Sequence, residues 1–505
     1  MSIPYLINSF RGGISDESNK GIVGAYKFGQ NLSIHSSDDI LMSNPTMYPV
    51  FGNSGSVISG CDSTTQTGII NYFVPASDGT IYCFGSTGSV FARNGDILDE
   101  ENPTKGKWNF VYNDENGAIK GAAEWKLNDG VNYLMWATDT SIARKELQGV
   151  DIVPDSGSAR WTDVNNNWKT TLDPADYHTM KNASGSLMIA NGNNLASIAY
   201  DGTFNPAVLN IRPGNLIKCI DERDDYTILG SYRKDSSEEG YIWSWIPTAL
   251  NWVQKKRIPV KGINCLINTE VMLLQGGTDG KLFYSDFTNA IPLCGILGGG
   301  QVEPGGVSIL DGIAMFGVYG GTHTGIWSYG RKQKNRPSVL NFDYKLVQYQ
   351  TSGSVVSTIA AVCAVNGVLY ASWGITDGST SEYGVNAVFS NYSEGIIYES
   401  LEFSAGKPYI KKIFNTVVVN MLPFTIDDPE ISVKYKIDKE DNWRYAITGA
   451  NSTSFWGIGA TEAIFTIGKP ANVYEVGIET RSNSGENLPK ILSITTYFEW
   501  GNEYA

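Results

Sequence analysis

The sequence repeats one short phrase, a turn followed by an alternating strand, along most of its length. One copy is "DGTIYCFG" from Asp78, where Asp-Gly supports the positive φ angles of a tight turn and the next residues alternate as in a strand. Similar copies begin at Asp129, Ser184, Asp225, Thr269, Asp311 and Asn366. The starts lie about 40 to 55 residues apart, a spacing typical of the blades of a β-propeller.

Most copies are followed by a second strand that contains an aromatic residue. Examples are "GSVFARNG" after Gly88, "LASIAYDG" after Asn194, "YIWSWI" from Tyr241, "KLFYSD" from Lys281, "GIWSYG" from Gly325 and "NAVFSN" from Asn386. A single four-stranded blade cannot bury both of its faces, whereas blades stacked in a closed ring bury them and leave no exposed end. We therefore predict an all-β fold with a β-propeller of about seven blades over residues 59–405.

The last hundred residues have a different pattern. The segment "ISVKYKID" from Ile431 alternates apolar and polar residues, which places Ile431, Val433, Tyr435 and Ile437 on one face of a strand. Other strand-like segments separated by Asn, Ser, Gly and Pro surround it. Half-buried antiparallel strands of this kind predict a β-sandwich over residues 406–505.

The first 58 residues lack a clear copy of the repeated phrase. They read as an extended N-terminal arm, which could supply a strand to the C-terminal region or reach a neighbouring subunit. The sequence does not choose between these two arrangements.

The composition agrees with an all-β chain and narrows the choice of partner. The chain has 55 Gly, 27 Tyr and 13 Trp, residues that suit turns and pleated surfaces. Its net charge is −14, and residues 51–405 hold 25 of the basic and 36 of the acidic side chains. An acidic body repels DNA and anionic lipid, so we expect neither nucleic-acid binding nor membrane insertion.

The six cysteines are expected to be buried free thiols. They are Cys61, Cys83, Cys219, Cys265, Cys294 and Cys363, without a CxxC pair. The N-terminus has no apolar segment typical of a signal peptide, and no run of 18 or more apolar residues occurs. We therefore expect a chain that is made in a cytoplasm and stays soluble.

The N-terminal arm resembles the opening of β-propeller virion proteins of tailed bacteriophages. Those proteins begin with F-x-GG-I, followed by a stretch with lysine and glycine, an N-L-x-I segment and a turn marked by aspartate. The matching residues here are Phe10, Gly12, Gly13, Ile14, Lys20, Gly21, Gly24, Phe28, Asn31, Leu32, Ile34, Asp38, Asp39 and Leu41. The phrases "ISVKYKID" and "VYEVGIETRS" resemble the domain that closes the same proteins. The resemblance implies a structural tail or tail-associated component in symmetric copies, and it carries over no catalytic residue.

The residues themselves indicate no catalytic, cofactor-binding or metal-binding site. The adjacent carboxylates are interpreted as loop charges rather than as a glycosidase pair. These pairs are Asp38–Asp39, Asp221–Glu222, Asp224–Asp225, Glu238–Glu239 and Asp427–Asp428. The three histidines, His35, His178 and His323, do not form a zinc motif, and His323 lies in a turn-like segment. The glycine-rich "CGILGGGQVEPGG" lacks the Lys-Ser/Thr of a phosphate loop and is expected to connect two blades.

Two weaker binding interpretations remain open. The loops "DERDDY" and "NDENGA" offer oxygen ligands for calcium without the spacing of an EF-hand. Tryptophans on propeller loops can stack on sugar rings, although packing between blades is the more ordinary role of such residues. The candidates are Trp243, Trp245, Trp252, Trp373 and Trp456.

From the resemblance we expect a structural, non-enzymatic component of a phage virion. Its partners would be other tail proteins and further copies of itself. The alternatives are a glycan- or receptor-binding propeller at the tail tip and a polysaccharide hydrolase. A propeller alone does not decide between them, because the fold hosts all three activities.

Overall fold

Each repeated phrase forms a strand in the computed structural model of the protein. The strand is the second of an antiparallel sheet and is hydrogen-bonded to the strand before it. These strands are β5 (Thr80–Gly85), β9 (Asn132–Ala137), β13 (Ser186–Asn191), β17 (Tyr226–Arg233), β21 (Met272–Gly276), β25 (Ile313–Val318) and β29 (Val368–Asp377). Six of the seven turns before them contain positive φ angles, such as 84° at Gly79 and 51° at Asp311, and the bend before β21 does not. The predicted strand is therefore confirmed at every copy, and the predicted turn at six of the seven.

The structure describes residues 2–15, 17, 22–35, 39–52, 66–94, 108–147, 161–235, 239–286, 289–332, 334–346, 358–377, 380–389, 395–424, 429–449, 451–482 and 488–501. Over these ranges the regular structure is β-strand, without α-helix, which confirms the all-β prediction. No helix long and apolar enough to cross a bilayer is present in this described part of the chain.

The chain divides into two compact units. The larger unit comprises residues 47–325 and 346–388, and the smaller unit comprises residues 1–46, 326–345 and 389–505. These bounds differ from the predicted domains 1–58, 59–405 and 406–505. The arm does not form a unit of its own, because its strands pair with strands from distant parts of the sequence.

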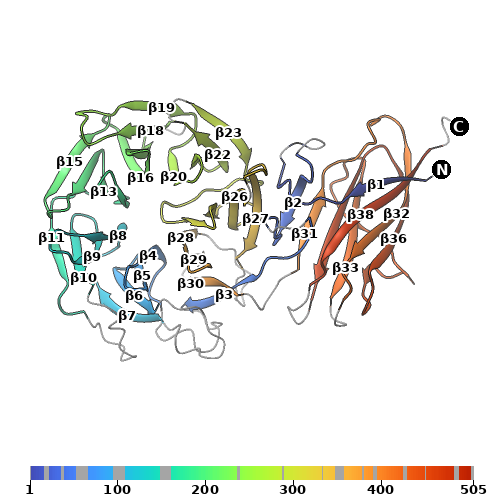
Figure 1. Ribbon diagram of the computed structural model, residues 1–505, viewed down its shortest axis with the longest axis horizontal. Helices are drawn as coiled ribbons and strands as arrows, with labels where there is room; N and C mark the ends of the chain where they lie inside the picture. Colours follow the sequence, from blue (N-terminus) through green and yellow to red (C-terminus); the bar gives the residue numbers. More distant parts are fainter. Residues whose placement is uncertain are drawn as a thin grey trace. The chain divides into compact units, whose positions relative to one another are not determined.

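Successive sheets of the larger unit stand side by side and close on themselves (Figure 1). Their first strands are β4 (Ile70–Pro75), β8 (Gly121–Lys126), β12 (Met180–Ala183), β16 (Asn215–Arg223), β20 (Ile263–Asn268), β24 (Val307–Leu310) and β28 (Thr358–Val365). Each of these strands contacts the next one, and β28 contacts β4. The cycle of contacts is therefore complete within the larger unit.

Third and fourth strands complete the sheets toward the outside of this cycle. They are β6 (Ser89–Asn94), β7 (Trp108–Asn113), β10 (Ile142–Glu146), β11 (Asn165–Lys169), β14 (Asn194–Ile198), β15 (Phe204–Asn210), β18 (Gly240–Trp245), β19 (Gln254–Ile258), β22 (Lys281–Ser285) and β23 (Ala290–Gly295). Each of these sheets uses four strands that are consecutive in the sequence.

The sheet that begins with β28 is built differently. Its order is β28-β29-β30-β3, with β30 at Thr380–Phe389 and β3 at Thr46–Gly52. The outermost strand therefore comes from the region that we assigned to the arm. This sheet thus joins the beginning of the larger unit to its end. The part of the arm that belongs to the smaller unit ends at residue 46, whereas we predicted an arm that ends at residue 58.

Apolar side chains fill the spaces between neighbouring sheets. Between the sheets of β4 to β7 and β8 to β11, the fully buried Phe84 and Trp136 have ring centroids 5.7 Å apart. The next spaces are filled by clusters that include Leu187 and Ile189, and then Leu229 and Trp243. Truncating one such buried tryptophan generally costs about 3–5 kcal/mol. Packing between sheets is therefore the main source of cohesion in this unit.

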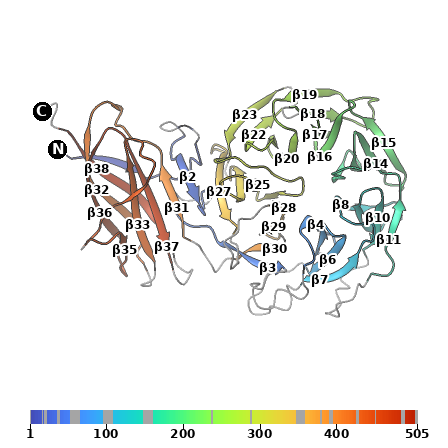
Figure 2. The ribbon, with the colours of Figure 1, turned by 180° about the vertical axis from the view of Figure 1, so that it is seen from behind.

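The smaller unit contains two antiparallel sheets and two further strands, β26 (Gly325–Gly330) and β27 (Val339–Lys345). The first sheet has the order β1-β38-β32-β36, and the second has the order β2-β31-β37-β33-β34, with β35 also paired to β33 (Figure 2). Their bounds are β1 (Ile3–Ile7), β2 (Tyr26–Gln30), β31 (Ile397–Ser400), β32 (Lys412–Met421), β33 (Glu430–Ile437), β34 (Arg444–Tyr445), β35 (Ser454–Phe455), β36 (Glu462–Ala471), β37 (Tyr474–Arg481) and β38 (Ile491–Trp500).

The arm supplies a strand to each of these two sheets. Strand β1 pairs with β38, and β2 pairs with β31. Of the two arrangements that the sequence left open, the structure therefore shows the pairing with C-terminal strands. Aromatic rings join the sheets, since Phe414 of β32 stacks on Tyr474 of β37 with centroids 4.4 Å apart.

Strand β33 confirms the predicted alternation. Ile431, Val433 and Tyr435 are buried, and Ile437 is half-buried. Between them, Lys434 is also buried, with only 5% of the residue exposed. Its ammonium group lies 2.8 Å from a carboxylate oxygen of Glu399 and 3.0 Å from one of Glu479.

We predict that Lys434→Ala destabilises the smaller unit by about 3 kcal/mol, because it leaves two half-buried carboxylates close together without the buried cation between them. Urea unfolding followed by circular dichroism measures this change. Lys469→Ala, at an exposed position of β36, is the matched control and should change stability by less than about 0.5 kcal/mol. Equal stability of the two variants would contradict this account of Lys434.

Candidate functional site

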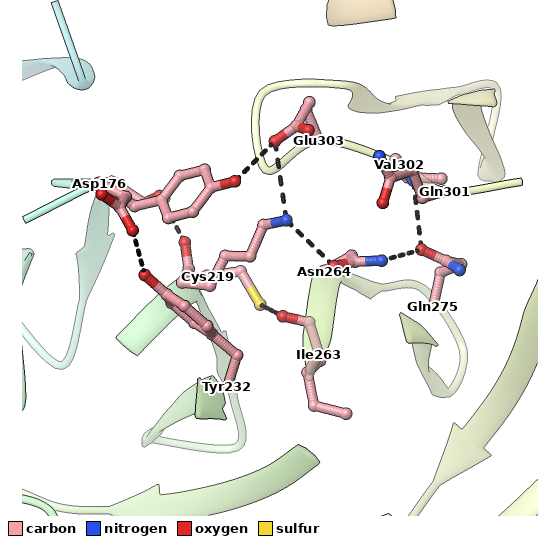
Figure 3. Close-up of polar contacts among 12 residues, drawn as sticks. Asp176, Cys219, Tyr232, Ile263, Asn264, Gln275, Gln301, Val302 and Glu303 are labelled. Atoms are coloured by element: carbon pink, nitrogen blue, oxygen red, sulfur yellow. Dashed lines mark hydrogen bonds and ion pairs between the residues drawn. The ribbon is translucent and has the colours of Figure 1, made fainter. Parts of the chain in front are cut away.

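Polar side chains meet between the inner strands of the larger unit (Figure 3). We call this group the Glu303 network. Its members are Tyr177, Lys218, Asn264, Gln275, Gln301, Glu303 and Tyr319. They come from β16, β20 and β21 and from segments next to β12, β24 and β25. The network thus links several sheets.

Glu303 reaches the network from the glycine-rich segment between β23 and β24, so this segment connects two sheets, as predicted. Gly305 explains why glycine is required here. A Cβ atom at this position would lie 2.2 Å from the carbonyl oxygen of Asn71 in β4 and 3.0 Å from that of Ala360 in β28. The absence of a side chain lets the backbone touch both strands, and this close approach positions Glu303.

The carboxylate of Glu303 accepts hydrogen bonds from two phenols and faces one ammonium group. The Tyr177 hydroxyl donates to Oε2 at 3.3 Å, and the Tyr319 hydroxyl donates to Oε1. Lys218 Nζ lies 3.7 Å from Oε2 and donates to Asn264 Oδ1 at 3.0 Å. The same ammonium lies 4.7 Å from the centre of the Tyr177 ring.

The network continues through amide side chains. Asn264 Nδ2 donates to Gln275 Oε1 at 2.9 Å, and the backbone N–H of Val302 donates to the same oxygen at 3.2 Å. Gln301 Nε2 donates to the Tyr319 hydroxyl at 2.8 Å. Asn264 and Gln275 belong to neighbouring strands of one sheet, and the bonds of Tyr177 and Val302 join residues far apart in the sequence, so the network fixes the positions of the inner strands.

The surroundings of Tyr177 and Tyr319 keep both phenols protonated, so they act as fixed hydrogen-bond donors in the network. Burial and the neighbouring Glu303 charge raise the pKa of Tyr177 and Tyr319 far above the usual value for tyrosine. Both phenols therefore stay protonated and donate to the carboxylate at any physiological pH. Two phenol hydrogen bonds and a nearby ammonium hold the Glu303 carboxylate in place, which suits a structural role.

The structure places the predicted histidines in three separate settings. His178 is buried, and its ring nitrogens lie 2.7 Å and 3.0 Å from the carbonyl oxygens of Ala190 and Asp139. Burial lowers its pKa more than these two carbonyls raise it. His35 Nε2 lies 3.0 Å from Ser328 Oγ, and His323 is half-buried in a bend. The structure does not bring these three side chains to a common site.

The predicted loop carboxylates follow the expectation only in part. Asp224 and Asp225 lie in an exposed turn with positive φ angles, as expected. Asp221 and Glu222 instead belong to β16, so the loop interpretation was wrong for this pair. Asp221 is buried and lies 3.1 Å from Lys181 Nζ.

The remaining pairs are only partly described. Asp39 forms an ion pair with Arg11, and Glu239 forms ion pairs with Arg233 and Arg257. The described ranges exclude Asp38, Glu238, Asp427 and Asp428. In the part of the chain that the structure covers, no three His, Cys, Asp or Glu side chains gather as metal ligands would.

The tryptophans and cysteines are mostly packing residues. Trp243, Trp245 and Trp373 are buried, and Trp252 packs edge-on against Trp243, which confirms packing for these four. Trp456 differs, because 64% of it is exposed. Buried free thiols are confirmed for Cys83, Cys219, Cys265 and Cys363. Cys61 and the side chain of Cys294 lie outside the described residues.

Sequence reasoning missed an aromatic cleft of about 630 Å³ on the larger unit. Trp125 of β8, Phe73 of β4 and Tyr200, which is 52% exposed, contribute rings to its lining. Asn132, Asn182, Lys181 and Glu124 add polar groups. The residues come from adjacent sheets, so no short motif announces the cleft.

We compared the chain with known proteins. No protein-family model and no curated protein matches it. Solved structures that resemble it include the WD40 β-propeller domain of Doa1, with a TM-score of 0.41 and 12% identity over 68% of this chain and 97% of that one. The β-propeller domain of Myceliophteria thermophila Cps50 (Swd1) has a TM-score of 0.39 and 10% identity, covering 65% and 98% of the two chains.

A third similar structure is the extracellular domain of a putative hybrid two-component system, BT4673, from B. thetaiotaomicron. Its TM-score is 0.42 at 13% identity, and the match covers 82% of this chain and 47% of that one. Scores and identities of this size carry no conclusion about function, so the resemblance to phage virion proteins stays a prediction.

We predict that Glu303→Ala destabilises the larger unit by about 3 kcal/mol, because it leaves the Lys218 ammonium buried without its anion. The loss should shrink in the double variant with Lys218→Met, since the two side chains are coupled. Urea unfolding followed by tryptophan fluorescence measures Glu303→Ala, Lys218→Met and the double variant. Strictly additive effects of the two substitutions would show that the ion pair contributes nothing.

Proposed function

We propose that this chain is a structural component of a tailed-phage virion, in the tail or associated with it. In this proposal the larger unit, with β24 and β25 as part of one blade, is a seven-bladed β-propeller. The two sheets of the smaller unit are a β-sandwich to which the arm belongs. The protein assembles in symmetric copies, docks onto neighbouring tail proteins and has no catalytic role.

The observation that carries this proposal is the role of the arm residues that resemble phage virion proteins. Phe10 is buried edge-on against Tyr398, with ring centroids 5.4 Å apart. A Cβ atom on Gly12 would lie 2.1 Å from the backbone nitrogen of Ala25, and Gly13 has a φ angle of 69°.

The rest of the motif also fastens the arm. The N–H of Ile14 donates to the carbonyl oxygen of Leu340 at 2.8 Å. Asn31 Nδ2 donates to the carbonyl oxygen of Gly395 at 3.2 Å, and Asn31 Oδ1 accepts from the N–H of Lys345 at 3.3 Å. The shared residues thus build and hold the arm, as a motif of a structural protein would.

Exposed apolar side chains on the smaller unit support docking onto other proteins. Ile464 of β36 is 50% exposed, and Ile447, which pairs with Thr466 of the same strand, is 44% exposed. Trp456 and Ile458 are 64% and 63% exposed. The pairing of Ile447 with Thr466 brings it near Ile464, and exposed apolar residues that lie close together commonly mark protein–protein contacts.

Cryo-electron microscopy of the intact particle tests the proposal. We expect the chain in a symmetric set in the tail or next to it, with Trp456 and Ile458 covered by a neighbouring subunit. Mass spectrometry of purified particles checks independently that the particle contains this chain. A particle that lacks the chain, or that holds it as one disordered copy, would sink the proposal.

The aromatic cleft favours one second candidate, glycan binding at a tail tip. Exposed rings next to amide and charged groups suit the alternating apolar and hydroxylated faces of a sugar. Trp125→Ala with Tyr200→Ala should then abolish binding on a glycan array, whereas Trp456→Ala should leave it unchanged. An array without any bound glycan for the unmodified protein would reject this candidate.

A further inference from the structure

A second cavity, of about 370 Å³, lies within the smaller unit. We call it the basic pocket. One wall comes from the arm, including Arg11 and His35, and the other comes from the connection between β26 and β27, including Lys332 and Arg336. These two stretches are about three hundred positions apart in the sequence and meet only because the arm lies along β27.

The lining of the basic pocket contrasts with the rest of the chain. Four of its thirteen lining residues are Arg or Lys, namely Arg11, Arg331, Lys332 and Arg336. Lys and Arg make up only 38 of the 505 residues, and the net charge of the chain is −14. None of the described residues that line the pocket is Asp or Glu. The pocket therefore concentrates positive charge on an acidic protein.

Internal bonds hold the cations of the pocket in place. Arg11 Nε lies 2.8 Å from Asp39 Oδ1, on the arm itself. Arg331 Nη1 donates to the carbonyl oxygen of Lys334 at 2.9 Å, which closes the turn after β26. The side chains of Lys332 and Arg336 project from this turn and are exposed. A partner thus meets a preformed wall.

The pocket also has an apolar rim, which favours an anionic group that carries apolar side chains over a small inorganic anion. Ile22 is 49% exposed and Val23 is 84% exposed, and Pro337 lies on the opposite wall. A free inorganic anion would leave these groups in contact with water. A protein segment that carries both carboxylates and apolar side chains would cover them and pair with the cations.

We infer that the basic pocket receives a carboxylate-bearing segment of a second copy of this chain. Charge complementarity selects this partner, because the chain itself has an excess of 14 acidic side chains and the pocket is a basic exception. In this inference the acidic segment lies outside the face that carries the pocket, and a heterologous contact of this kind propagates into a ring or a helix. This inference rests on the proposed function, whose symmetric copies it explains.

Sedimentation velocity of the purified full-length protein tests the inference. At about 50 mM NaCl we expect a concentration-dependent oligomer that dissociates at about 500 mM, because salt screens charge pairs. Lys332→Glu with Arg336→Glu should weaken association at least about tenfold, since it reverses two cations at the contact. Arg11 and Arg331 stay unchanged because they stabilise the arm and the turn.

Lys469→Glu with Lys490→Glu is the matched control, because it makes the same change of charge at exposed positions of the same unit. This control should associate like the unmodified protein. The pocket variant still has its acidic segment, so a small amount of it should bind to the ends of unmodified oligomers and shorten them. A two-fold symmetric contact between two basic pockets would not give this result.

Three outcomes would overturn the inference. In the first, the unmodified protein stays monomeric at low salt. In the second, the pocket variant forms the oligomer as well as the unmodified protein does. In the third, the unmodified protein is a monomer whose melting temperature rises with inorganic phosphate, and the melting temperature of the pocket variant does not rise. The last outcome would make the pocket a site for small anions. None of the three affects the test of the proposed function, which asks whether the particle contains the chain.

Discussion

The closure of the ring of sheets is the constraint on which the larger unit depends. Each sheet buries its faces only against its neighbours, so a gap at any position would expose two apolar faces at once. The contact of β28 with β4 removes that gap, and β3 completes the sheet that begins with β28. A side-chain network at the inner strands then adds directed hydrogen bonds to this apolar packing.

Arm residues play a comparable part in the smaller unit. Strands β1 and β2 occupy positions in two different sheets, and the glycines of the arm permit backbone contacts that any larger residue would block. The same docking builds one wall of the basic pocket. The path of the arm along β27 therefore contributes both to the strand pairing of this unit and to its basic pocket.

Local features of the sequence predict local features of the structure well. Turn residues such as Asp78 and Asn366 are followed by strands because their conformational preferences act over a few residues. Alternation at Ile431 and Val433 predicts a buried face for the same reason. Pairings between distant segments leave no such trace, which is why β3 was assigned to the arm and Asp221 to a loop.

The candidate sites were harder to predict than the fold, because their residues come from distant parts of the sequence. Trp125 and Tyr200, like Arg11 and Lys332, come together only through the tertiary fold, so their spacing in the sequence says nothing about them. The glycine-rich segment around Glu303 was predicted to connect two blades, but neither the role of the carboxylate nor the strands that the segment contacts could be inferred from the sequence.

The pairing of the N-terminal strands has a consequence for biosynthesis. Strand β1 must wait for β38, and β3 must wait for β30, because more than three hundred residues separate the members of each pair in the sequence. Until the later strands are made, the edges of the earlier strands lack their partners, and strand pairing over so long a stretch of sequence is generally slow. The time for which an early strand edge stays open to aggregation therefore grows with the length of chain that must still be made before its partner.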